Sequence, residues 1–247
     1  MSSEQSTILK PYEHTTISGI AQNESAPITQ TIHLPVGKVV CVGRNYMDHI
    51  RELDNEVSEI PLLFMKPSTA IVDMREDLVL PINQGECHNE LELAVLIGKK
   101  LSKADTQQAS TAVRGLGLGL DLTLRDEQKR LKSAGQPWER AKSFDGSCPL
   151  SPFVLVESLD PNSHFTFQLE LNDELVQNGD TRLMLTPILQ LVSEISQHFT
   201  LLPGDVVLTG TPKGVGPLRE GDNLKAILEG QFSVSTKVLS SIQGIKK

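Results

Sequence analysis

Two stretches in the middle of the chain decide the fold: ELELAVLI at residues 90–97 and GLGLGLD at residues 115–121. In both, apolar side chains alternate with other residues, which is the period of a β-strand. The first stretch places four aliphatic side chains on one face and Glu90 with Glu92 on the other, about 7 Å apart. In the second, the face opposite the leucines is bare glycine until Asp121, so another backbone or a ligand can approach it closely.

Outward from these stretches, the sequence predicts more strands than helices. Further strand-like runs lie at 39–42, 61–65, 165–171, 206–208 and 225–228. Helices are expected at 46–53, with Asn45 as a candidate cap, at 125–134 before Gly135, and from Thr186-Pro187 to Phe199. The strand-helix alternation of a doubly wound sheet is missing. The predicted fold class is therefore α+β, a strand-rich mixed β-roll or sandwich with few short helices.

The chain reads as one main unit with a short leader. Residues 1–36 are polar and weakly patterned, and we expect a loosely attached leader or short strands there. Residues 37–247 contain no internal repeat, low-complexity tract or linker that would divide them. We therefore predict a single domain over residues 37–247.

Composition narrows the class of protein. The 247 residues include 31 acidic and 23 basic side chains, a formal net charge of −8, which argues against a nucleic-acid partner. No apolar run approaches the roughly 20 residues of a membrane helix. Cys41, Cys87 and Cys148 are odd in number and widely spaced, which disfavours a disulfide framework or a four-cysteine zinc site. We therefore expect a cytoplasmic protein without nucleic-acid or membrane partners.

The carboxylates of the two deciding stretches suggest a metal site. Glu90 and Glu92 repel each other unless a cation lies between them, and oxygen-only ligands favour Mg²⁺, Mn²⁺ or Ca²⁺ over zinc. Asp121 is a lone acid at the end of an apolar segment, where an acid usually needs a partner. We predict a three-carboxylate metal site, the alternative being an edge strand with a solvated acidic face. Arg125 and Gln128 follow closely enough to line the same pocket, although spacing alone does not decide this.

Three further features each have a chemical and an ordinary interpretation. His49 and Glu52, at i and i+3 on an expected helix, form either a pair that takes a proton from water or a routine surface pair. Lys142 either pairs with an anionic substrate or extends along the surface. The segment TGTPKGVG at 209–216 is not a P-loop. It either holds a small carboxylate through its amides and hydroxyls or is a glycine-rich connection.

Five segments, in order between about residue 38 and about residue 238, resemble the fumarylacetoacetate hydrolase family, most closely its short acylpyruvate hydrolase and oxaloacetate decarboxylase members. They are VGRNY at 42–46, HNELEL at 88–93, LDLTLRD at 120–126, AKSFD at 141–145 and LTGTP at 208–212. Five motifs in order are far more specific than any one alone. Asn89 departs from the pattern, since many relatives have a second histidine there, and this affects the surroundings of the metal ligands but not the ligands themselves.

The resemblance implies a strand-rich α+β roll, usually a homodimer, and a role for each matching residue. Glu90, Glu92 and Asp121 would hold Mg²⁺ or Mn²⁺. The implied catalytic residues are His49 and Glu52, which activate water, and Lys142, which stabilises oxyanion charge. The implied substrate-binding residues are Arg44, Arg125, Gln128, Thr209 and Thr211.

The resemblance also implies a metal-dependent hydrolase or decarboxylase that cleaves a C–C bond of small 2-keto acids through a metal-stabilised enolate. Acylpyruvates would give pyruvate and a carboxylate, and oxaloacetate would give pyruvate and CO₂. Two alternatives within the family stay open: an isomerase or decarboxylase of unsaturated dicarboxylic acids in aromatic catabolism, and an oxaloacetate keto–enol tautomerase. A keto-acid-binding module is the non-enzyme alternative. His49 with Glu52 favours the hydrolase, because hydrolysis needs an activated water.

Overall fold

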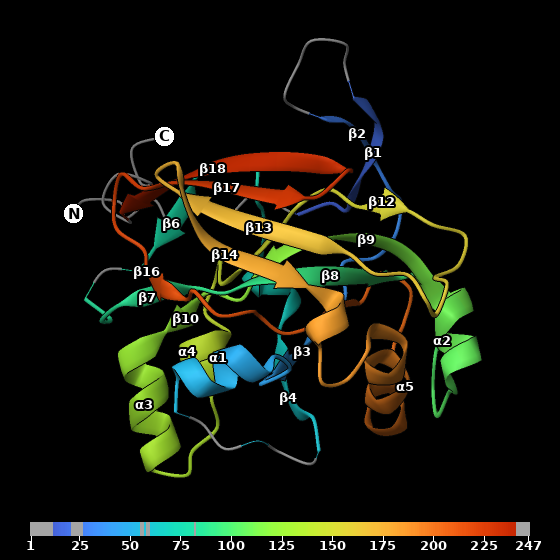
Figure 1. Cartoon of the computed structure of the whole chain (residues 1–247), viewed down its shortest axis with the longest axis horizontal. Helices are drawn as coiled ribbons and strands as arrows, with labels where there is room; N and C mark the ends of the chain where they lie inside the picture. Colours follow the sequence, from blue (N-terminus) through green and yellow to red (C-terminus); the bar gives the residue numbers. More distant parts are fainter. Residues whose placement is uncertain (1–11, 21–26, 55–56, 58–59, 82, 241–247) are drawn as a thin grey trace, which may run out of the picture.

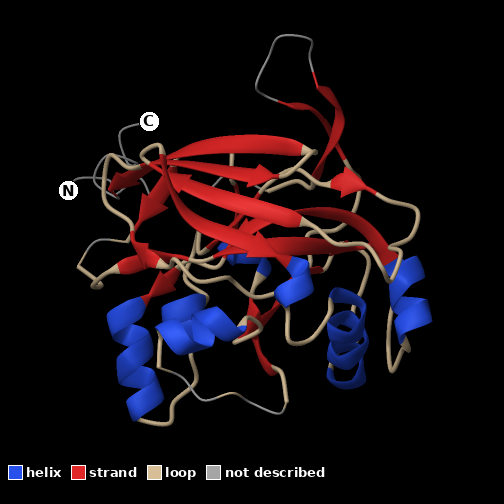
Figure 2. Cartoon of the chain, viewed as in Figure 1, coloured by secondary structure: helices blue, strands red, loops and turns tan. Residues whose placement is uncertain are grey.

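The computed structural model describes residues 12–20, 27–54, 57, 60–81 and 83–240. Its strands are β1 Thr15–Ile20, β2 Pro27–Thr31, β3 Val39–Gly43, β4 Leu62–Lys66, β5 Ile71–Asp73, β6 Leu78–Leu80, β7 Cys87–Asn89, β8 Leu91–Ile97, β9 Val113–Leu120, β10 Thr123–Leu124, β11 Cys148–Leu150, β12 Val154–Leu155, β13 Thr166–Leu171, β14 Glu174–Asp180, β15 Val206–Leu208, β16 Gly216–Pro217, β17 Asn223–Leu228 and β18 Phe232–Ser240. Its helices are α1 Met47–Glu52, η1 Ser68–Ala70, α2 Thr106–Ala112, α3 Arg125–Ser133, α4 Glu139–Lys142, η2 Thr181–Leu183 and α5 Ile188–His198. The predicted strand-rich α+β class is confirmed (Figure 2).

β8 lies inside the largest sheet, whose strand order is β4-β3-β15-β8-β9-β11-β5 with β12 also paired to β9. Its neighbours β15 and β9 both run antiparallel to it. All seven residues of β8 are buried, so neither of its faces is exposed to solvent. Leu91 and Leu93 pack into one apolar cluster, and Ala94 and Leu96 pack into another. The alternative of an edge strand with a solvated acidic face is therefore wrong.

The glycine face of β9 is covered by the protein itself. A Cβ atom at Gly117 would lie 2.9 Å from the backbone oxygen of Pro152, and one at Gly119 would lie 2.6 Å from Cδ2 of Leu208. These distances are too short for any side chain other than hydrogen. The expected close approach is thus made by the chain leading into β12 and by β15, and not by a ligand.

A five-stranded sheet in the order β14-β13-β17-β18-β6 packs over the large one. In Figure 1 it lies on one side of β8 and β9, while α1, α3, α4 and α5 gather on the other side. Phe167 and Leu169 of β13 share the larger apolar cluster with Leu91 and Leu93 of β8, which joins the two sheets. A small sheet in the order β10-β7-β16 lies next to α3 and carries the chain into and out of the carboxylate segments.

The expected helices form, with one correction and one addition. Gly135, with φ +62°, follows α3 as its C-terminal glycine, as predicted. Asn45 does not cap α1, because the N-cap position is Tyr46, without a side-chain cap. α2 was not predicted, although Asp105 and Gln108 form a reciprocal capping box that signals a helix start.

The described part of residues 1–36 contains β1 and β2, which pair with each other. His14 is buried, and its Nε2 lies 3.0 Å from the backbone oxygen of Gly204. The backbone amide of Phe153 donates to the oxygen of Thr15 at 2.8 Å. A domain boundary near residue 36 remains a prediction. Among the described residues, no helix has the length and apolar character needed to cross a membrane.

Candidate metal centre

The antiparallel register of β8 and β9 brings the three predicted carboxylates together. Leu91 pairs with Leu120, so Glu90 lies beside Asp121, whose amide donates to the backbone oxygen of Glu90 at 2.8 Å. One oxygen from each of Glu90, Glu92 and Asp121 lies within 4.8 Å of the others, and all three side chains are buried. Antiparallel pairing of β8 with β9 thus converts two separate sequence motifs into one acidic cluster.

The cluster forms the inner end of a cavity of about 130 Å³. Its walls come from the end of β3, from α1, β4, α3, α4 and the loop after β15. The cavity contains nine of the predicted site residues: Arg44, His49, Glu90, Glu92, Asp121, Arg125, Gln128, Lys142 and Thr211. Glu52 and Thr209 lie outside its lining. The individual roles of these residues remain predictions, but the structure gathers most of them in one place.

Glu90 is held by two cations. Lys142 Nζ lies 2.8 Å from its Oε2, and Arg125 Nη2 lies 2.6 Å from its Oε1. Burial by itself would raise the pKa of Glu90, but the charges of Lys142 and Arg125 outweigh it and hold that pKa well below its usual range. Burial opposes the charge of Lys142, yet Asp121 and Glu90 raise its pKa above the usual range. Both groups therefore stay charged at neutral pH.

Glu92 has a different environment. Its Oε2 accepts a hydrogen bond from the backbone amide of Gly210 at 2.6 Å. Burial, followed by repulsion from Asp121, raises the pKa of Glu92 well above its usual range, and the Gly210 amide only partly opposes this. Glu92 is consequently the member of the cluster that most lacks a positive charge beside it.

Lys66, at the end of β4, was not predicted as a site residue. Its side chain is fully buried, and its Nζ lies 2.8 Å from Oδ1 of Asp121. The ammonium also donates to the backbone oxygens of Ser147 at 3.0 Å and of Lys142. It therefore ties Asp121 to the end of α4 that carries Lys142. A lysine closing an apolar strand run was the available signal, the same signal that singled out Asp121.

α1 carries the expected histidine–glutamate pair. His49 is almost fully buried, and its Nδ1 lies 3.3 Å from Oε2 of Glu52. The other oxygen of Glu52 accepts from the amide of Gly214 at 2.9 Å, which fastens α1 to the loop after β15. Because Nδ1 faces Glu52, Nε2 is the ring nitrogen left to exchange a proton. The interpretation as an ordinary surface pair fits this burial poorly.

The turn between β3 and α1 is also specialised. Arg44 has φ +63°, a left-handed backbone that residues other than glycine adopt infrequently, and its side chain lines the cavity. Asn45 joins this turn to two distant loops: its Nδ2 donates to the backbone oxygens of Thr209 at 2.9 Å and Thr186 at 3.0 Å. Asn45 thus holds the cavity wall in place instead of capping α1.

The loop after β15 rests on β8. The hydroxyl of Thr209 donates to the backbone oxygen of Leu93 at 2.9 Å, and that of Thr211 donates to the oxygen of Leu91 at 2.8 Å. Gln177, which was not predicted, is buried and donates to the Thr211 hydroxyl at 2.8 Å. These bonds use both hydroxyls for support. Thr211 borders the cavity, whereas Thr209 lies behind it.

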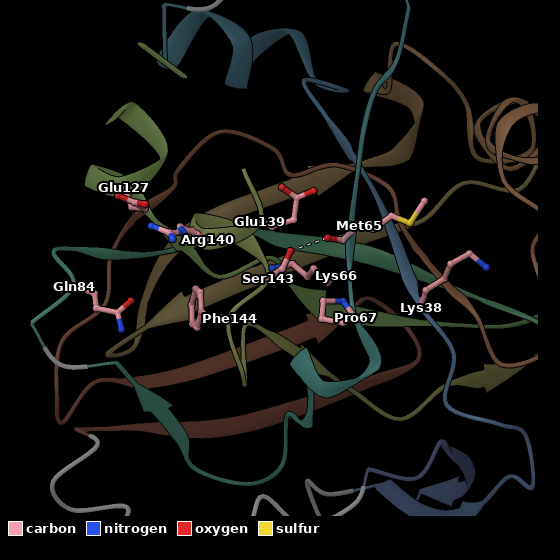
Figure 3. A pocket seen from close by; sticks show the side chains of 10 residues that line it. All are labelled: Lys38, Met65, Lys66, Pro67, Gln84, Glu127, Glu139, Arg140, Ser143 and Phe144. Carbon is pink, nitrogen blue, oxygen red and sulfur yellow. Dashed lines mark hydrogen bonds between the residues drawn. The ribbon is translucent and has the colours of Figure 1, made fainter. Parts of the chain in front are cut away.

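A larger hollow of about 910 Å³ lies beside β4 and α4 (Figure 3). Its lining includes Lys66, Arg140 and Phe144 but no residue of the predicted site. Ser143 donates to the backbone oxygen of Met65 at 2.7 Å, the bond drawn in Figure 3. The larger hollow is therefore not the candidate site, because the three carboxylates meet in the smaller cavity.

The residues of the small cavity fit a hard divalent ion. Glu90, Glu92 and Asp121 offer only oxygen atoms, the ligands that Mg²⁺ and Mn²⁺ prefer. Oδ1 of Asp121 is buried and accepts no hydrogen bond of normal geometry from any described residue, although the Lys66 ammonium is nearby. Glu92 needs a positive charge, and a bound cation would supply it. No histidine or cysteine belongs to this cluster, so zinc has no preferred ligand in it.

Comparison with known proteins identifies the family of the chain. A family model described as fumarylacetoacetate (FAA) hydrolase C-terminal matches residues 38–239. The chain belongs to the fumarylacetoacetate hydrolase family. This confirms the resemblance inferred from the five motifs, and it makes the chain a member of an enzyme family.

Relatives within the fumarylacetoacetate hydrolase family have several activities. The chain is 50% identical over 206 residues to the oxaloacetate tautomerase YcgM of Escherichia coli, covering 83% of this chain and 94% of that protein. It is 43% identical over 200 residues to the mitochondrial oxaloacetate tautomerase FAHD1 of Homo sapiens, covering 81% and 90%. A fumarylpyruvate hydrolase from Pseudomonas aeruginosa, solved with Mn²⁺ and pyruvate, matches with a TM-score of 0.82 and 33% identity over 96% of this chain and 100% of that one.

Proposed function

We propose that the protein is an Mg²⁺- or Mn²⁺-dependent enzyme for small 2-keto acids and that its principal reaction is keto–enol tautomerisation of oxaloacetate. The observation that carries this proposal is the buried cluster of Glu90, Glu92 and Asp121 in one cavity with His49 and Lys142. The identity of 50% to an oxaloacetate tautomerase of similar length supports the choice of reaction. This places the tautomerase, an alternative from the sequence, ahead of the hydrolase.

The ion would be held by Glu90, Glu92 and Asp121, and when bound it supplies positive charge beside the keto and carboxylate oxygens of the substrate. Arg125 and Gln128 lie in the same cavity, with Arg125 Nη1 donating to Gln128 Oε1 at 2.7 Å. This pair presents donors to the substrate carboxylate. We assign Arg44 and the Thr209–Thr211 loop to the same end of the substrate as supporting contacts.

The proton transfer falls to His49. With Glu52 fixing its Nδ1, His49 takes a proton from C3 of the keto form through Nε2 and returns it in the reverse direction. Negative charge then develops on the oxygen at C2. The positive charge of Lys142, whose ammonium donates to Glu90, Asp121 and the Thr123 hydroxyl, stabilises that negative charge. His49 Nε2 then gives its proton to the oxygen at C2, so the sum is one proton moved from carbon to oxygen with no change in oxidation state.

C–C cleavage is the second candidate function. The His49–Glu52 pair favours it, because the same base can take a proton from water as that water attacks an acyl group at C3. The bond between C3 and the acyl carbon then breaks, giving a carboxylic acid and pyruvate. Decarboxylation of oxaloacetate needs no activated water, because the electrons of the breaking bond between C3 and C4 flow toward C2 as CO₂ leaves. The fumarylpyruvate hydrolase solved with Mn²⁺ and pyruvate is consistent with this second reaction.

A two-channel assay tests the proposal. Oxaloacetate and acetylpyruvate are each followed by enol absorbance while released pyruvate is measured, with Mg²⁺, with Mn²⁺ and with chelator. The proposal predicts metal-dependent enol–keto conversion of oxaloacetate beyond the blank, faster than pyruvate release. The same assay is run on Glu92→Gln, which changes one carboxylate of the cluster. Its matched control is Glu174→Gln, which changes an exposed carboxylate on β14. Binding of a keto acid without any turnover would favour the binding-module alternative.

We also propose, from the family resemblance, a homodimer and a cytoplasmic location. Light scattering coupled to gel filtration tests the first, with a mass twice that of one chain expected. Fractionation of the source cells tests the second.

A further inference from the structure

An aromatic wall leads outward from the carboxylate cluster. Lys142 Nζ lies 5.1 Å from the centre of the Phe64 ring, and the Phe64 ring lies 6.2 Å from the ring of Trp138. Lys132 Nζ lies 6.0 Å from the Trp138 ring. All four residues line the small cavity. The wall thus begins at a buried cation beside the carboxylates and ends at an exposed cation on α3.

Acidic and basic side chains are unevenly distributed between the inner and outer ends of this cavity. Its acidic lining residues are the three carboxylates at the inner end, and there Lys142 and Arg125 are paired with them. Lys129 and Lys132 also line the cavity from α3, on exposed positions. Lys129 forms no ion pair with any residue that the structure describes.

Like charges are crowded at this outer end. Burial, followed by repulsion from Arg44 and Arg125, lowers the pKa of Lys132. An anion at this place would relieve the repulsion, just as the three carboxylates do for Lys142 at the inner end. Lys129 and Lys132 are three positions apart on α3, so their side chains project from the same side of the helix.

We propose that Lys129 and Lys132 bind a carboxylate at the far end of the substrate, with Phe64 and Trp138 along its carbon chain. The inference rests on the proposed function, because it takes the 2-keto acid end to lie at the carboxylate cluster. The enzyme then selects 2-keto acids with an anionic tail over acylpyruvates with a neutral one. It also gives a physical reason for preferring a longer unsaturated dicarboxylate, whose tail can extend past Phe64 and Trp138, to acetylpyruvate.

Three substrates and two substitutions test this selection. The ratio kcat/KM is measured with Mn²⁺ for oxaloacetate, fumarylpyruvate and acetylpyruvate, which share the 2-keto acid head and differ in the charge of the tail. The double variant Lys129→Gln/Lys132→Gln removes both charges. We expect about a tenfold loss for fumarylpyruvate, whose longer tail carries its carboxylate outward to both lysines, mainly in KM, since each exposed pair contributes a factor of about two to five. Acetylpyruvate, with a neutral tail, and oxaloacetate, with a carboxylate too close to its keto group to reach the lysines, should change less than about twofold.

Two further variants serve as controls. Arg130 lies between the two lysines in sequence but pairs with Glu127 at 2.7 Å and does not line the cavity, so Arg130→Gln should leave all three ratios unchanged. Lys132→Arg keeps the charge and should keep most of the preference. Raising the salt concentration should weaken the wild-type preference and leave the double variant unaffected, because exposed charges are screened.

The outcomes separate the two proposals. Equal loss for all three substrates, or no loss for any, would overturn the role of the lysines while leaving the proposed function intact. Absence of metal-dependent turnover of every substrate by the wild type would overturn the proposed function and this inference together. A loss confined to fumarylpyruvate, the substrate with a long anionic tail, supports the inference.

Discussion

Glu90 and Glu92 are two residues apart, equally buried and part of the same cavity, yet their surroundings are opposite. Glu90 lies between Lys142 and Arg125, and after the cost of burial these charges leave its pKa below the usual range. Glu92 accepts a hydrogen bond from the amide of Gly210 but forms no ion pair with any residue that the structure describes, and its pKa is raised by burial and by Asp121. The chain therefore neutralises one half of the cluster itself and leaves the other half for a cation from outside.

The difference shows how the cluster can fold without an ion and still bind one. Three buried cations, Lys66, Lys142 and Arg125, stand against three buried carboxylates. Such pairs are costly to break, because removing one partner leaves a buried charge uncompensated. An additional positive charge therefore stabilises the cluster most when it lies beside Glu92.

The largest expected effect comes from replacing Glu90 or Asp121, the two proposed metal ligands that form ion pairs with cations of the chain itself. Glu90→Gln or Asp121→Asn should abolish divalent-ion binding and reduce kcat/KM by about 10³-fold or more, since the charge that stabilises the enolate is lost. Steady-state rates and Mn²⁺ binding are measured on the same samples. Full activity of either variant in chelator would contradict the metal assignment.

The next effect concerns stability. Lys66→Met removes one of the two buried ammonium partners of Asp121 and the bonds to the backbone oxygens of Ser147 and Lys142, so we expect a loss of about 3–5 kcal/mol in the free energy of unfolding. Urea denaturation measures it. Lys225→Met, which removes the exposed 3.0 Å pair with Glu170, should cost less than about 1 kcal/mol. Similar costs at both positions would show that Lys66 is not part of the cluster.

A third effect separates the base from the carboxylates. His49→Ala should slow hydrolysis of acetylpyruvate by about 10²-fold or more and slow tautomerisation, while decarboxylation of oxaloacetate suffers less because it needs no activated water. His198→Ala removes the exposed pair with Glu194 on α5 and should change none of these rates. Equal loss of hydrolysis and decarboxylation would contradict this division of roles.

The smallest expected effect is on stability, and here the direction of the change distinguishes Glu92 from Glu90. In chelator, Glu92→Gln should raise the free energy of unfolding at pH 7 by about 1–3 kcal/mol, because it keeps an acceptor for the Gly210 amide and removes a repelled buried charge. Glu90→Gln should lower that free energy, because it leaves Lys142 and Arg125 with less compensation. Thermal melts of the two variants are compared with the wild type.

The pH dependence follows from the same pKa shifts. The contribution of Glu92 is fully present below its unfolded value of 4.5 and is lost as pH rises toward its raised folded value. The contribution of Glu90 has the opposite sign: it is present above 4.5 and is lost as pH falls toward its lowered folded value. Glu92→Gln should therefore remove a fall in stability above pH 4.5 that the ion-free wild type shows. An unchanged profile would mean that Glu92 is not repelled in the folded protein.

The acidic cluster could be predicted because its cause is local. Alternation places Glu90 and Glu92 on one face, and Asp121 ends the neighbouring apolar run, so the antiparallel pairing of Leu91 with Leu120 brings the three together. The family motifs added Arg125, Gln128 and Lys142. The fold class followed from the same alternation and from the scarcity of helical periods.

Lys66 and Gln177 could not be predicted in the same way, because their partners are far along the chain. Lys66 reaches backbone oxygens 56 to 81 positions away, and Gln177 reaches Asn89, 88 positions away. No spacing rule signals such contacts. The supporting role of the Thr209 hydroxyl depends in the same way on how the loop after β15 lies on β8.

Direct measurement of ion binding tests the central claim, that Glu92 marks the place of a divalent cation. Mn²⁺ is titrated into the wild type, Glu92→Gln and the control Glu174→Gln, with free Mn²⁺ followed by electron paramagnetic resonance and melting temperature recorded at each point. The account predicts one Mn²⁺ per chain and a rise in melting temperature for the wild type and the control, with neither for Glu92→Gln. Equal binding by Glu92→Gln, or no binding by the wild type, would contradict it.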